Sequence, residues 1–472
     1  MRKMTKRFLA GIMSAAMIAS FAACSDDGSG DSGTGGGGGT TEAATTETTT
    51  EKTEWTGDNY EVTADDGALD TTLDTQGKTL KYLGFYDLNP TNDSPERSVE
   101  LSIFEDVYGA KVEYIATTSA TQFDDLANAI IGGTPPDVVV HSDRTFPYDI
   151  SKNQFQPVGA LIDWSDPMWA AVKDTADKFL WNGEYYVAPL GYSFNDFRMF
   201  MYNQSTIDEE GLDDPLELFE AGNWTWDEFV RLQKEYQSAD PENRYGVCGY
   251  WADAFVYTAG DPIVDFDGSK FINNIYSANI ERAQGILEDL FANNLVKTGW
   301  YLGDVFDASG ETLFYGMGTW AYEHVAGAYP SDEIKMVPFP RNPDSNDNVT
   351  SKKLLAYMWV KGSENNDVVK AWFDSNRLAA YDPQYADVTK DKFLTHAPTW
   401  NSDLYDLVME LNDDEKFPYA FDYGMGISEA MTGDNGYIRT LYECISNGTY
   451  EKWSQAREEF SNIIDSEISA FN

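Results

Sequence analysis

Several aromatic side chains stand beside residues that favour turns, and their chemistry is the most informative in the sequence. A flat ring next to a turn is hard to bury, and a pyranose requires such a surface. The apolar face of the sugar stacks on the ring, and its hydroxyl groups bond nearby side-chain donors and acceptors. The turn-associated rings are Trp164 and Trp169 near Asp166-Pro167, Trp181 beside Asn182-Gly183, Trp251, Trp300-Tyr301 and Trp320-Tyr322. Other rings, such as Trp372, Phe373 and Trp453, occupy apolar positions of helical patterns, and we assign them to the core.

The segment GETLFYGMGTWAYEHV, residues 310–325, combines these features. Leu313 and Phe314 read as a core strand, but glycine disfavours the interior of both strands and helices. We therefore interpret Gly316 and Gly318 as positions where the backbone bends at a strand end and something approaches closely. The turn then directs Trp320 into a cleft rather than a core.

Other chemistries find little support. His141, His324 and His396 are isolated from one another, and no spacing suggests a zinc site, so we expect no metal and no cofactor. There is no Ser/His/Asp order for hydrolysis, and we expect no enzymatic activity. Carboxylates are abundant, however, so a secreted glycoside hydrolase with paired acids stays open as an alternative. The sequence does not decide whether Cys248 and Cys444 form a disulfide.

The elements that position these residues alternate between strands and helices. Strands are predicted over 78–87, 111–118 and 134–140, and helices over 94–110, with Ser94 as its cap, and over 121–133. The second of these helices presents one apolar face, formed by Phe123, Leu126, Ala127, Ile130 and Ile131. Further helices are predicted from a capping box at Thr225, over 278–296, with Phe291 on its apolar face, and over 449–471. This order predicts an α/β fold with a parallel-type sheet covered by helices.

The N-terminal region reads as an export signal followed by a tether. Four basic residues precede an apolar stretch too short to span a membrane comfortably, and residues 21–24, Phe-Ala-Ala-Cys, resemble a bacterial lipobox. We predict a lipoprotein signal peptide over 1–24 with the lipid on Cys24; an ordinary secretory signal is the alternative. Residues 25–77, rich in Gly, Ser, Thr and Glu, are predicted to be a disordered tether with a mean reach of roughly 40 Å.

Size and charge restrict the remaining chain. Roughly 395 residues are left after the tether, too many for a single core, so two lobes are expected. The formal net charge is −46, and removal of the predicted signal brings it to about −50. Nucleic acid and anionic lipid headgroups are therefore poor partners, whereas a neutral or cationic ligand is easier to accommodate.

Several short segments share the order and spacing of a known family. They are PPDVVVHSDRTF (135–146), WNGEYYVAPLGYSFNDFRMFMYNQSTI (181–207), NWTWDEFVRL (223–232) and the 310–325 segment. From residue 78 to the C-terminus, about 80% of the chain, the sequence resembles the family 1 extracellular solute-binding proteins of bacterial ABC importers, which include maltose-binding proteins.

The resemblance implies a set of ligand contacts. Trp320 takes the position of a tryptophan that stacks on the sugar, and Tyr322 that of another aromatic residue. Contacts from the first lobe are implied for Asp87, at the end of the first strand, and for the Asp143-Arg144 pair; Trp251 and Asp253 are implied for the second lobe. Two family positions are not matched. A glutamate after the crossover is replaced by Ser193, with Asn195 and Asp196 nearby, and an aromatic pair near the C-terminus has Tyr437 and Arg439 as the nearest residues.

The implied architecture has two α/β lobes with a ligand cleft between them. The first lobe spans about 78–190 and 340–396, and the second about 191–335 and 400–472, with hinge crossovers near 189–193, 335–340 and 396–400. The expected function is capture of a soluble carbohydrate, an oligosaccharide in the first instance, by a lipid-anchored monomer on the extracytoplasmic face of the membrane, for delivery to a permease. A binding protein for a peptide, polyamine or organic acid is one alternative, and an adhesin for insoluble polysaccharide is another.

Overall fold

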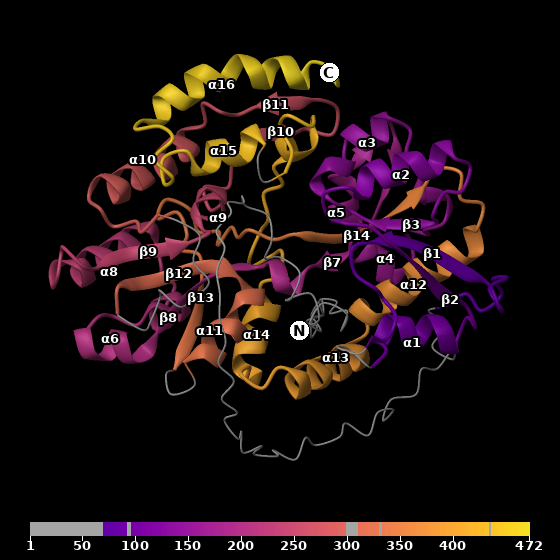
Figure 1. The fold of residues 1–472 in the computed structure, drawn as a ribbon, viewed down its shortest axis with the longest axis horizontal. Coiled ribbons are helices and arrows are strands. Elements are labelled where there is room, and N and C mark those ends of the chain that lie inside the picture. The colour runs from indigo at the N-terminus through magenta and orange to yellow at the C-terminus, as the bar shows by residue number, and fades with distance from the viewer. Residues whose placement is uncertain (1–68, 92–95, 299–309, 330–332, 434–435) are drawn as a thin grey trace, which may run out of the picture.

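The computed structural model describes residues 69–91, 96–298, 310–329, 333–433 and 436–472, and these fold into two lobes (Figure 1). The predicted signal, Cys24, most of the predicted tether, Ser94 and Trp300-Tyr301 lie outside the described residues. Each lobe contains its own β-sheet with helices packed around it, which confirms the prediction of a two-lobe α/β fold.

The first lobe, drawn on the right of Figure 1, is built on a six-stranded mixed sheet. β1 (Thr79–Gly84) pairs in parallel with β2 (Lys111–Ala116) and β3 (Val138–Val140). β14 (Leu354–Val360) is antiparallel to β3, and its other edge pairs with both β4 (Phe155–Gln156) and β7 (Val187–Tyr192). The helices of this lobe are α1 (Val99–Asp106), α2 (Gln122–Ile131), α3 (Tyr148–Ser151), α4 (Pro167–Ala170), α5 (Lys173–Asp177), α12 (Asn366–Tyr381) and α13 (Pro383–His396).

The second lobe is built on a four-stranded sheet in the order β13-β8-β12-β9. Its strands are β8 (Arg198–Asn203), β9 (Tyr245–Gly249), β12 (Thr312–Gly318) and β13 (Ile334–Pro338). Its helices are α6 (Gln204–Glu210), α7 (Pro215–Glu220), α8 (Trp226–Ser238), α9 (Ala252–Tyr257), α10 (Ala278–Ala292), α11 (Tyr322–Ala328), α15 (Tyr437–Glu443) and α16 (Trp453–Ile468). Two small hairpins, β5 (Leu180–Trp181) with β6 (Glu184–Tyr185) and β10 (Val264–Phe266) with β11 (Phe271–Asn273), project from the first and second lobe respectively.

The chain passes between the two sheets later than the sequence predicted. β7 stays in the first sheet as far as Tyr192, and β8 enters the second sheet at Arg198, so the first crossover covers 193–197 rather than 189–193. It contains the short helix η5 (Phe194–Asp196). The second crossover runs from the end of β13 at Pro338 to the start of β14 at Leu354. The third predicted crossover falls between α13 and α14 (Ser402–Glu410).

The folded part begins earlier than predicted. Leu69 is buried in the core of the first lobe, and the hydroxyl of Thr75 donates to the carbonyl of Tyr108 at 2.7 Å. Residues 69–77 therefore belong to the folded domain and not to the tether. The segment resembles a tether in composition because it has few apolar residues. One buried leucine and one buried hydroxyl nevertheless attach it to the first lobe.

Two helix predictions were wrong in detail. α1 starts at Val99 with Ser98 as its N-cap, because the Ser98 hydroxyl accepts from the Leu101 N–H. α8 begins after Thr225 as predicted, but the Thr225 side chain forms no capping hydrogen bond, so the capping box is not made. Two residues assigned to apolar faces are exposed at helix ends, Ile131 at 84% and Phe291 at 38%. The predicted core residues Trp372, Phe373 and Trp453 are buried.

The described residues settle two questions that the sequence left open. Cys248 and Cys444 are both buried and both free, so they do not form a disulfide. Within the same ranges, the helices lack the length and apolar content needed to cross a membrane.

A buried carboxylate in the first lobe makes stability depend on pH. Glu100 of α1 is 2% exposed, and burial raises the pKa of its carboxyl group to about 7. Because this value lies above the unfolded value of 4.5, the native state holds an extra proton between the two, and the free energy of unfolding falls as pH rises through that window. We expect Glu100→Gln to be more stable than wild type above neutral pH, by on the order of 1–3 kcal/mol.

Urea unfolding from about pH 5 to about pH 8 measures this effect. The Glu100→Gln profile should be flatter than that of wild type. Glu113→Gln, at an exposed position of β2, is the control and should follow wild type. Parallel profiles for Glu100→Gln and wild type would contradict the prediction.

Candidate ligand site between the lobes

The ends of the strands in both sheets meet at the crossovers. β1, β2 and β3 are parallel, so their carboxyl ends lie at one edge of the first sheet, and the antiparallel β14 starts at that edge. In the second sheet β9 and β12 are parallel, and the antiparallel β8 starts at their carboxyl ends, directly after the first crossover. Ligands of open α/β sheets bind beyond the carboxyl ends of the strands, so the space between the lobes is the candidate site.

A cavity of about 40 Å³ lies in this space and takes its walls from both lobes. Its aromatic lining residues are Phe146 and Phe179 from the first lobe, Tyr257 from the second, and Tyr419, Phe421 and Tyr423 from a C-terminal segment. His141, Asp143 and Asp422 supply polar groups to the lining. A cavity of this size holds a few water molecules, so a sugar ring requires the lobes to separate or the lining side chains to move.

Asp422 fixes the C-terminal segment to the second lobe. Its carboxylate accepts hydrogen bonds from the backbone N–H groups of Ile263 (3.0 Å), Val264 (3.1 Å) and Gly424 (2.9 Å), and from the hydroxyl of Tyr442. Burial raises the pKa of this carboxyl group to about 6, although the four donors oppose the shift. The donors occupy both carboxylate oxygens, so Asp422 mainly holds the segment in place.

His141 is a neutral group in the wall of the first lobe. Its Nδ1 lies 2.6 Å from the hydroxyl of Thr145, and burial lowers its pKa to about 3, with a smaller contribution from the charge of Lys353. An imidazole that stays uncharged at neutral pH can exchange hydrogen bonds with hydroxyl groups and does not attract anions. Among the described residues, no group of His, Cys, Asp or Glu is arranged to hold a metal ion.

Aromatic contacts and backbone contacts join the lobes along one side of the cavity. Trp181, in the β5–β6 hairpin, packs against Phe266 (ring centroids 6.3 Å apart) and Phe271 (6.0 Å) of the β10–β11 hairpin. The short helix η7 (Tyr423–Gly426) packs against η3 (Asp143–Thr145), which follows β3 in the first lobe. Trp181, one of the turn-associated rings, is therefore engaged in contacts between the lobes.

The 310–325 segment forms a strand and then a turn beside the first crossover. Thr319 donates its backbone N–H to the carbonyl of Phe197 at 2.9 Å and its hydroxyl to the carbonyl of Phe194. Trp320 follows in η6 (Thr319–Ala321) and is half-buried. A Cβ on Gly318 would lie 2.6 Å from the indole of Trp320, so the glycine is required for this ring to fold back over the turn.

Gly316 has a different role from the one that the sequence suggested. A Cβ at this position would lie 2.3 Å from the Cβ of Trp251 and 3.0 Å from the ring of Phe200. The group that approaches Gly316 closely is therefore a core tryptophan. Trp251 is 3% exposed and packs among Phe200, Phe229 and Phe255. Its ring is therefore part of the core of the second lobe, and its ligand contact stays a prediction.

Two more predicted aromatic contacts are placed away from the cavity. Tyr322 is 5% exposed; its hydroxyl donates to the carbonyl of Ile334 at 3.1 Å, and its ring packs on Trp400. Tyr437 packs on Phe460 of α16 with ring centroids 5.4 Å apart. Ser193 is buried in the first crossover, where its hydroxyl donates to Asp196 at 2.6 Å.

Two predicted residues of the second lobe, Arg439 and Asp253, do come together. The guanidinium of Arg439 lies 3.3 Å from the carboxylate of Asp253 and 3.8 Å from the ring centroid of Tyr250, over which Arg198 also lies at 4.2 Å. Burial lowers the pKa of Arg439 to about 10, while Glu443, at 2.9 Å, and the first-lobe residue Asp143 oppose the shift. Asp143 is exposed and lines the cavity.

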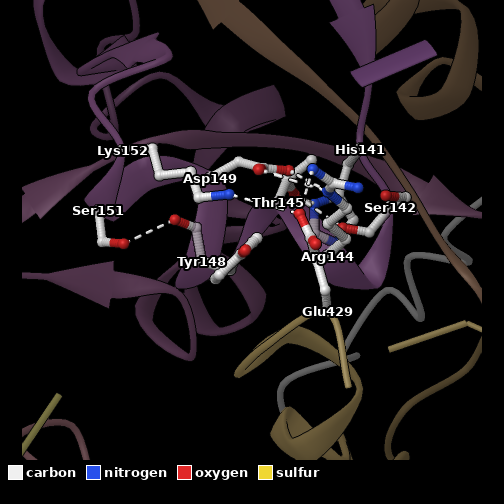
Figure 2. Close-up of polar contacts among 9 residues, drawn as sticks. All are labelled: His141, Ser142, Arg144, Thr145, Tyr148, Asp149, Ser151, Lys152 and Glu429. Atoms are coloured by element: carbon white, nitrogen blue, oxygen red, sulfur yellow. Dashed lines mark hydrogen bonds and ion pairs between the residues drawn. The ribbon is translucent and has the colours of Figure 1, made fainter. Parts of the chain in front are cut away.

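Arg144 is held by partners of its own chain (Figure 2). Its Nε donates to the carboxylate of Asp149 at 3.1 Å, and its Nη2 lies 3.5 Å from Glu429 of the C-terminal segment, which Lys152 also approaches at 3.5 Å. The guanidinium also lies over the ring of Phe123 at 5.0 Å. Asp87, the last predicted contact, follows β1 and is half-buried.

The C-terminal lining residues were missed by sequence reasoning. The stretch 417–426, FPYAFDYGMG, places aromatic residues at every second position and then two glycines. The regular alternation of rings, with Pro418 and Gly424 nearby, was the available signal. Three of the four rings, those of Tyr419, Phe421 and Tyr423, line the cavity.

Comparisons with known proteins place the fold. Residues 93–375 match the family described as Bacterial extracellular solute-binding protein. Three structurally similar proteins are an ABC substrate-binding protein of Listeria monocytogenes solved with cycloalternan (16% identity, 83% of this chain and 99% of that chain, TM-score 0.59), a cyclic α-maltosyl-1,6-maltose binding protein of Arthrobacter globiformis (14%, 84% and 98%, 0.58), and UgpB of Mycobacterium tuberculosis solved with glycerophosphocholine (16%, 83% and 98%, 0.58).

No curated relative matches the sequence. The family match covers more than half of the chain and confirms the resemblance seen in the sequence, together with an extracytoplasmic location and a binding rather than enzymatic role. The chain belongs to the bacterial extracellular solute-binding proteins.

Proposed function

We propose that this protein is the carbohydrate-binding lipoprotein of a bacterial ABC importer, which captures an oligosaccharide by closure of the cleft between its lobes and delivers it to a membrane permease. The observation that carries this proposal is the interlobe cavity, where aromatic rings and carboxylates from both lobes meet at the strand ends. One structurally similar protein was solved in complex with cycloalternan and another is described as a cyclic α-maltosyl-1,6-maltose binding protein, which supports a sugar as the ligand class.

The geometry suggests how binding couples to closure. The cavity walls come from both lobes, and the lobes are connected through crossovers that contain Ser193, Asp196 and Lys352. A sugar that contacts both walls has higher affinity for the closed arrangement and therefore shifts the population toward it. Lys352 stiffens the second crossover, because its buried ammonium donates to Asp414 at 2.7 Å and lies over the ring of Tyr192.

Membrane attachment completes the proposal. A lipid on Cys24 and a tether over residues 25–68 would hold a monomeric domain near the membrane. A tether of this length has a mean reach of roughly 40 Å, enough to let the closed protein meet a permease. Mass spectrometry of the membrane-extracted protein tests the lipid: a mature N-terminus at Cys24 carrying acyl chains supports it, and an unmodified cysteine overturns it.

A calorimetric panel tests the ligand class. Maltose, maltotetraose, cycloalternan and D-tagatose form the sugar arm; spermidine, choline, glycerophosphocholine and a tetrapeptide form the other arm. Binding confined to the second arm would overturn the sugar proposal and favour a cationic solute, which the net charge of −46 accommodates. New reducing ends in the maltotetraose sample would instead indicate a hydrolase, and capture only on insoluble glycan would indicate an adhesin.

Trp320 provides a direct test of stacking. It is half-buried beside the first crossover, and a stacked ring contributes about 1 kcal/mol beyond the area that it buries. We expect Trp320→Ala to weaken binding of the tightest panel sugar about tenfold by calorimetry. Trp320→Leu keeps an apolar side chain without the flat ring and should also bind weakly, whereas Trp320→Phe should retain most affinity. Equal affinities for all four proteins would show that the ring does not stack.

A further inference from the structure

Phe85 is an exposed aromatic ring at the edge of the first sheet that faces the crossovers. It follows β1 directly, and its side chain is 49% exposed. The other large apolar residues that are exposed among the described residues lie at or next to the ends of helices; they are Ile131, Tyr276, Phe291 and Tyr437. Single exposed rings are common on protein surfaces, so the position of Phe85 and its neighbours must carry the argument.

The neighbouring tyrosine holds Phe85 in a defined place. The ring of Tyr86 contacts Phe85 edge to face, with ring centroids 5.3 Å apart. The same ring also packs against Tyr82, with centroids 6.0 Å apart. Tyr82 is itself buried in the core of the first lobe. Tyr86 is thus anchored inward, and Phe85 rests against a fixed neighbour. A ring that is already ordered loses little conformational entropy when a ligand stacks on it.

A carboxylate with an available oxygen lies two residues away. Asp87 accepts from the backbone N–H and the side-chain amide of Asn89, both at 2.9 Å and both on Oδ1. Within the described part of the chain Oδ2 accepts no hydrogen bond. A flat apolar ring beside a free carboxylate oxygen supplies the two groups that a pyranose needs, a stacking surface and an acceptor for hydroxyl groups.

Phe85 and Asp87 lie across the first crossover from Trp320. In the first sheet only β3 separates β1 from β14, and the N–H of Ser193, at the start of the first crossover, donates to the carbonyl of Lys353 directly before β14 at 2.9 Å. On the other side, the Cβ position of Gly318, two residues before Trp320, is 3.1 Å from the carbonyl of Asn195. The same short segment therefore separates Phe85 of the first lobe from Trp320 of the second.

We propose that Phe85, together with the free oxygen of Asp87, forms a sugar subsite on the first lobe that works as the counterpart of Trp320. This inference rests on the proposed function. A sugar that stacks on Phe85 and on Trp320 contacts both lobes, so the Phe85 contact contributes to closure as well as to affinity. The subsite takes a neutral pyranose unit, because the acceptor beside the ring is a carboxylate and the pair offers no cation for an acidic sugar.

Calorimetry and fluorescence test the subsite. The tightest binder among maltose, maltotetraose, cycloalternan and D-tagatose is titrated into wild type, Phe85→Ala and Phe85→Leu of the mature chain. We expect Phe85→Ala and Phe85→Leu to bind about tenfold more weakly than wild type, since both lack the flat ring. Tyr276→Ala is the matched control, because Tyr276 is 51% exposed but lies before α10 in the second lobe, and it should bind as wild type does.

A second readout follows the ring itself. In Phe85→Trp the new indole should change its emission on addition of that sugar beyond the change in wild type, whereas Tyr276→Trp should add no such change. The subsite is overturned, while the proposed function stands, under three joint results. Wild type binds a panel sugar, Phe85→Ala binds it as tightly as Tyr276→Ala does, and Phe85→Trp shows no larger emission change than Tyr276→Trp. If wild type binds none of the sugars, the proposed function fails and the subsite fails with it.

Discussion

Arg144→Ala is expected to lose about 3–5 kcal/mol of stability before any ligand is considered. Asp149, its partner at 3.1 Å, has a fully buried side chain, and Arg144 opposes the burial-driven rise in the pKa of Asp149 more than any other group. Removal of the guanidinium leaves an uncompensated carboxylate inside the first lobe. The loss also removes the contact with Glu429, but that residue is 61% exposed, and an exposed ion pair contributes only about 0–1 kcal/mol.

Weak sugar binding by Arg144→Ala would therefore not show that Arg144 contacts the sugar, because the substitution also destabilises the first lobe. A double-mutant cycle separates the two roles. In Arg144→Ala/Asp149→Asn the buried charge is gone, so urea unfolding should recover a substantial part of the lost stability. Sugar affinity measured on this double variant, against Asp149→Asn alone, then tests the ligand contact that we predict for Arg144. An Arg144→Ala protein as stable as wild type would show that the buried pair is not needed.

Lys152 offers a comparison within the same group of residues (Figure 2). Its ammonium lies 3.5 Å from Glu429 and 3.7 Å from the ring centroid of Tyr148, and its side chain is 41% exposed. Lys152→Ala removes a cation from the same carboxylate without uncovering a buried charge. Its effect on stability should stay within about 1 kcal/mol.

The two-lobe fold could be predicted because its signals are local. Alternating strands and helices follow from periodicity, and α2, α8, α10 and α16 lie where the apolar patterns place them. The errors at element ends also have local causes. The apolar run after Lys78 was read as a strand up to residue 87, but β1 ends at Gly84, and the following Phe85 is exposed rather than buried. A continuous apolar run does not show where hydrogen bonding with a neighbouring strand ends.

The site was less predictable because burial depends on residues distant in sequence. Trp251 stands beside a turn, which suggested exposure, but the missing side chain of Gly316 on a neighbouring strand leaves room for it in the core. Conversely, the rings of Tyr419, Phe421 and Tyr423 line the cavity because Asp422 ties that segment to β10 through backbone N–H groups of Ile263 and Val264. Neither arrangement can be read from the spacing of residues within one segment.

Gly426 determines how closely the lobes approach, and Gly426→Ala is the second large effect that we expect. A Cβ at this position would lie 2.0 Å from the carbonyl oxygen of Phe146 and 2.2 Å from that of Asp143. Both are backbone atoms of the first lobe, so no side-chain rotation relieves the overlap, and η7 must move away from η3 by about 1 Å to restore normal contact. The cavity lies between these two segments, with Asp143 on one wall and Tyr423 on the other.

The expected result is a loss of roughly 3 kcal/mol from the arrangement in which the lobes touch. If the lobes touch in the unliganded protein, urea unfolding shifts by that amount; if they touch only on closure, stability is unchanged and the affinity for the panel sugar falls at least about tenfold. Gly285→Ala is the control, because its Cβ would meet open space within α10, where alanine is favoured over glycine by about 1 kcal/mol. A Gly426→Ala protein that matches wild type in both stability and affinity would show that η7 and η3 do not control closure. Because the two measurements respond to different states, this one substitution also reports which state places η7 against η3.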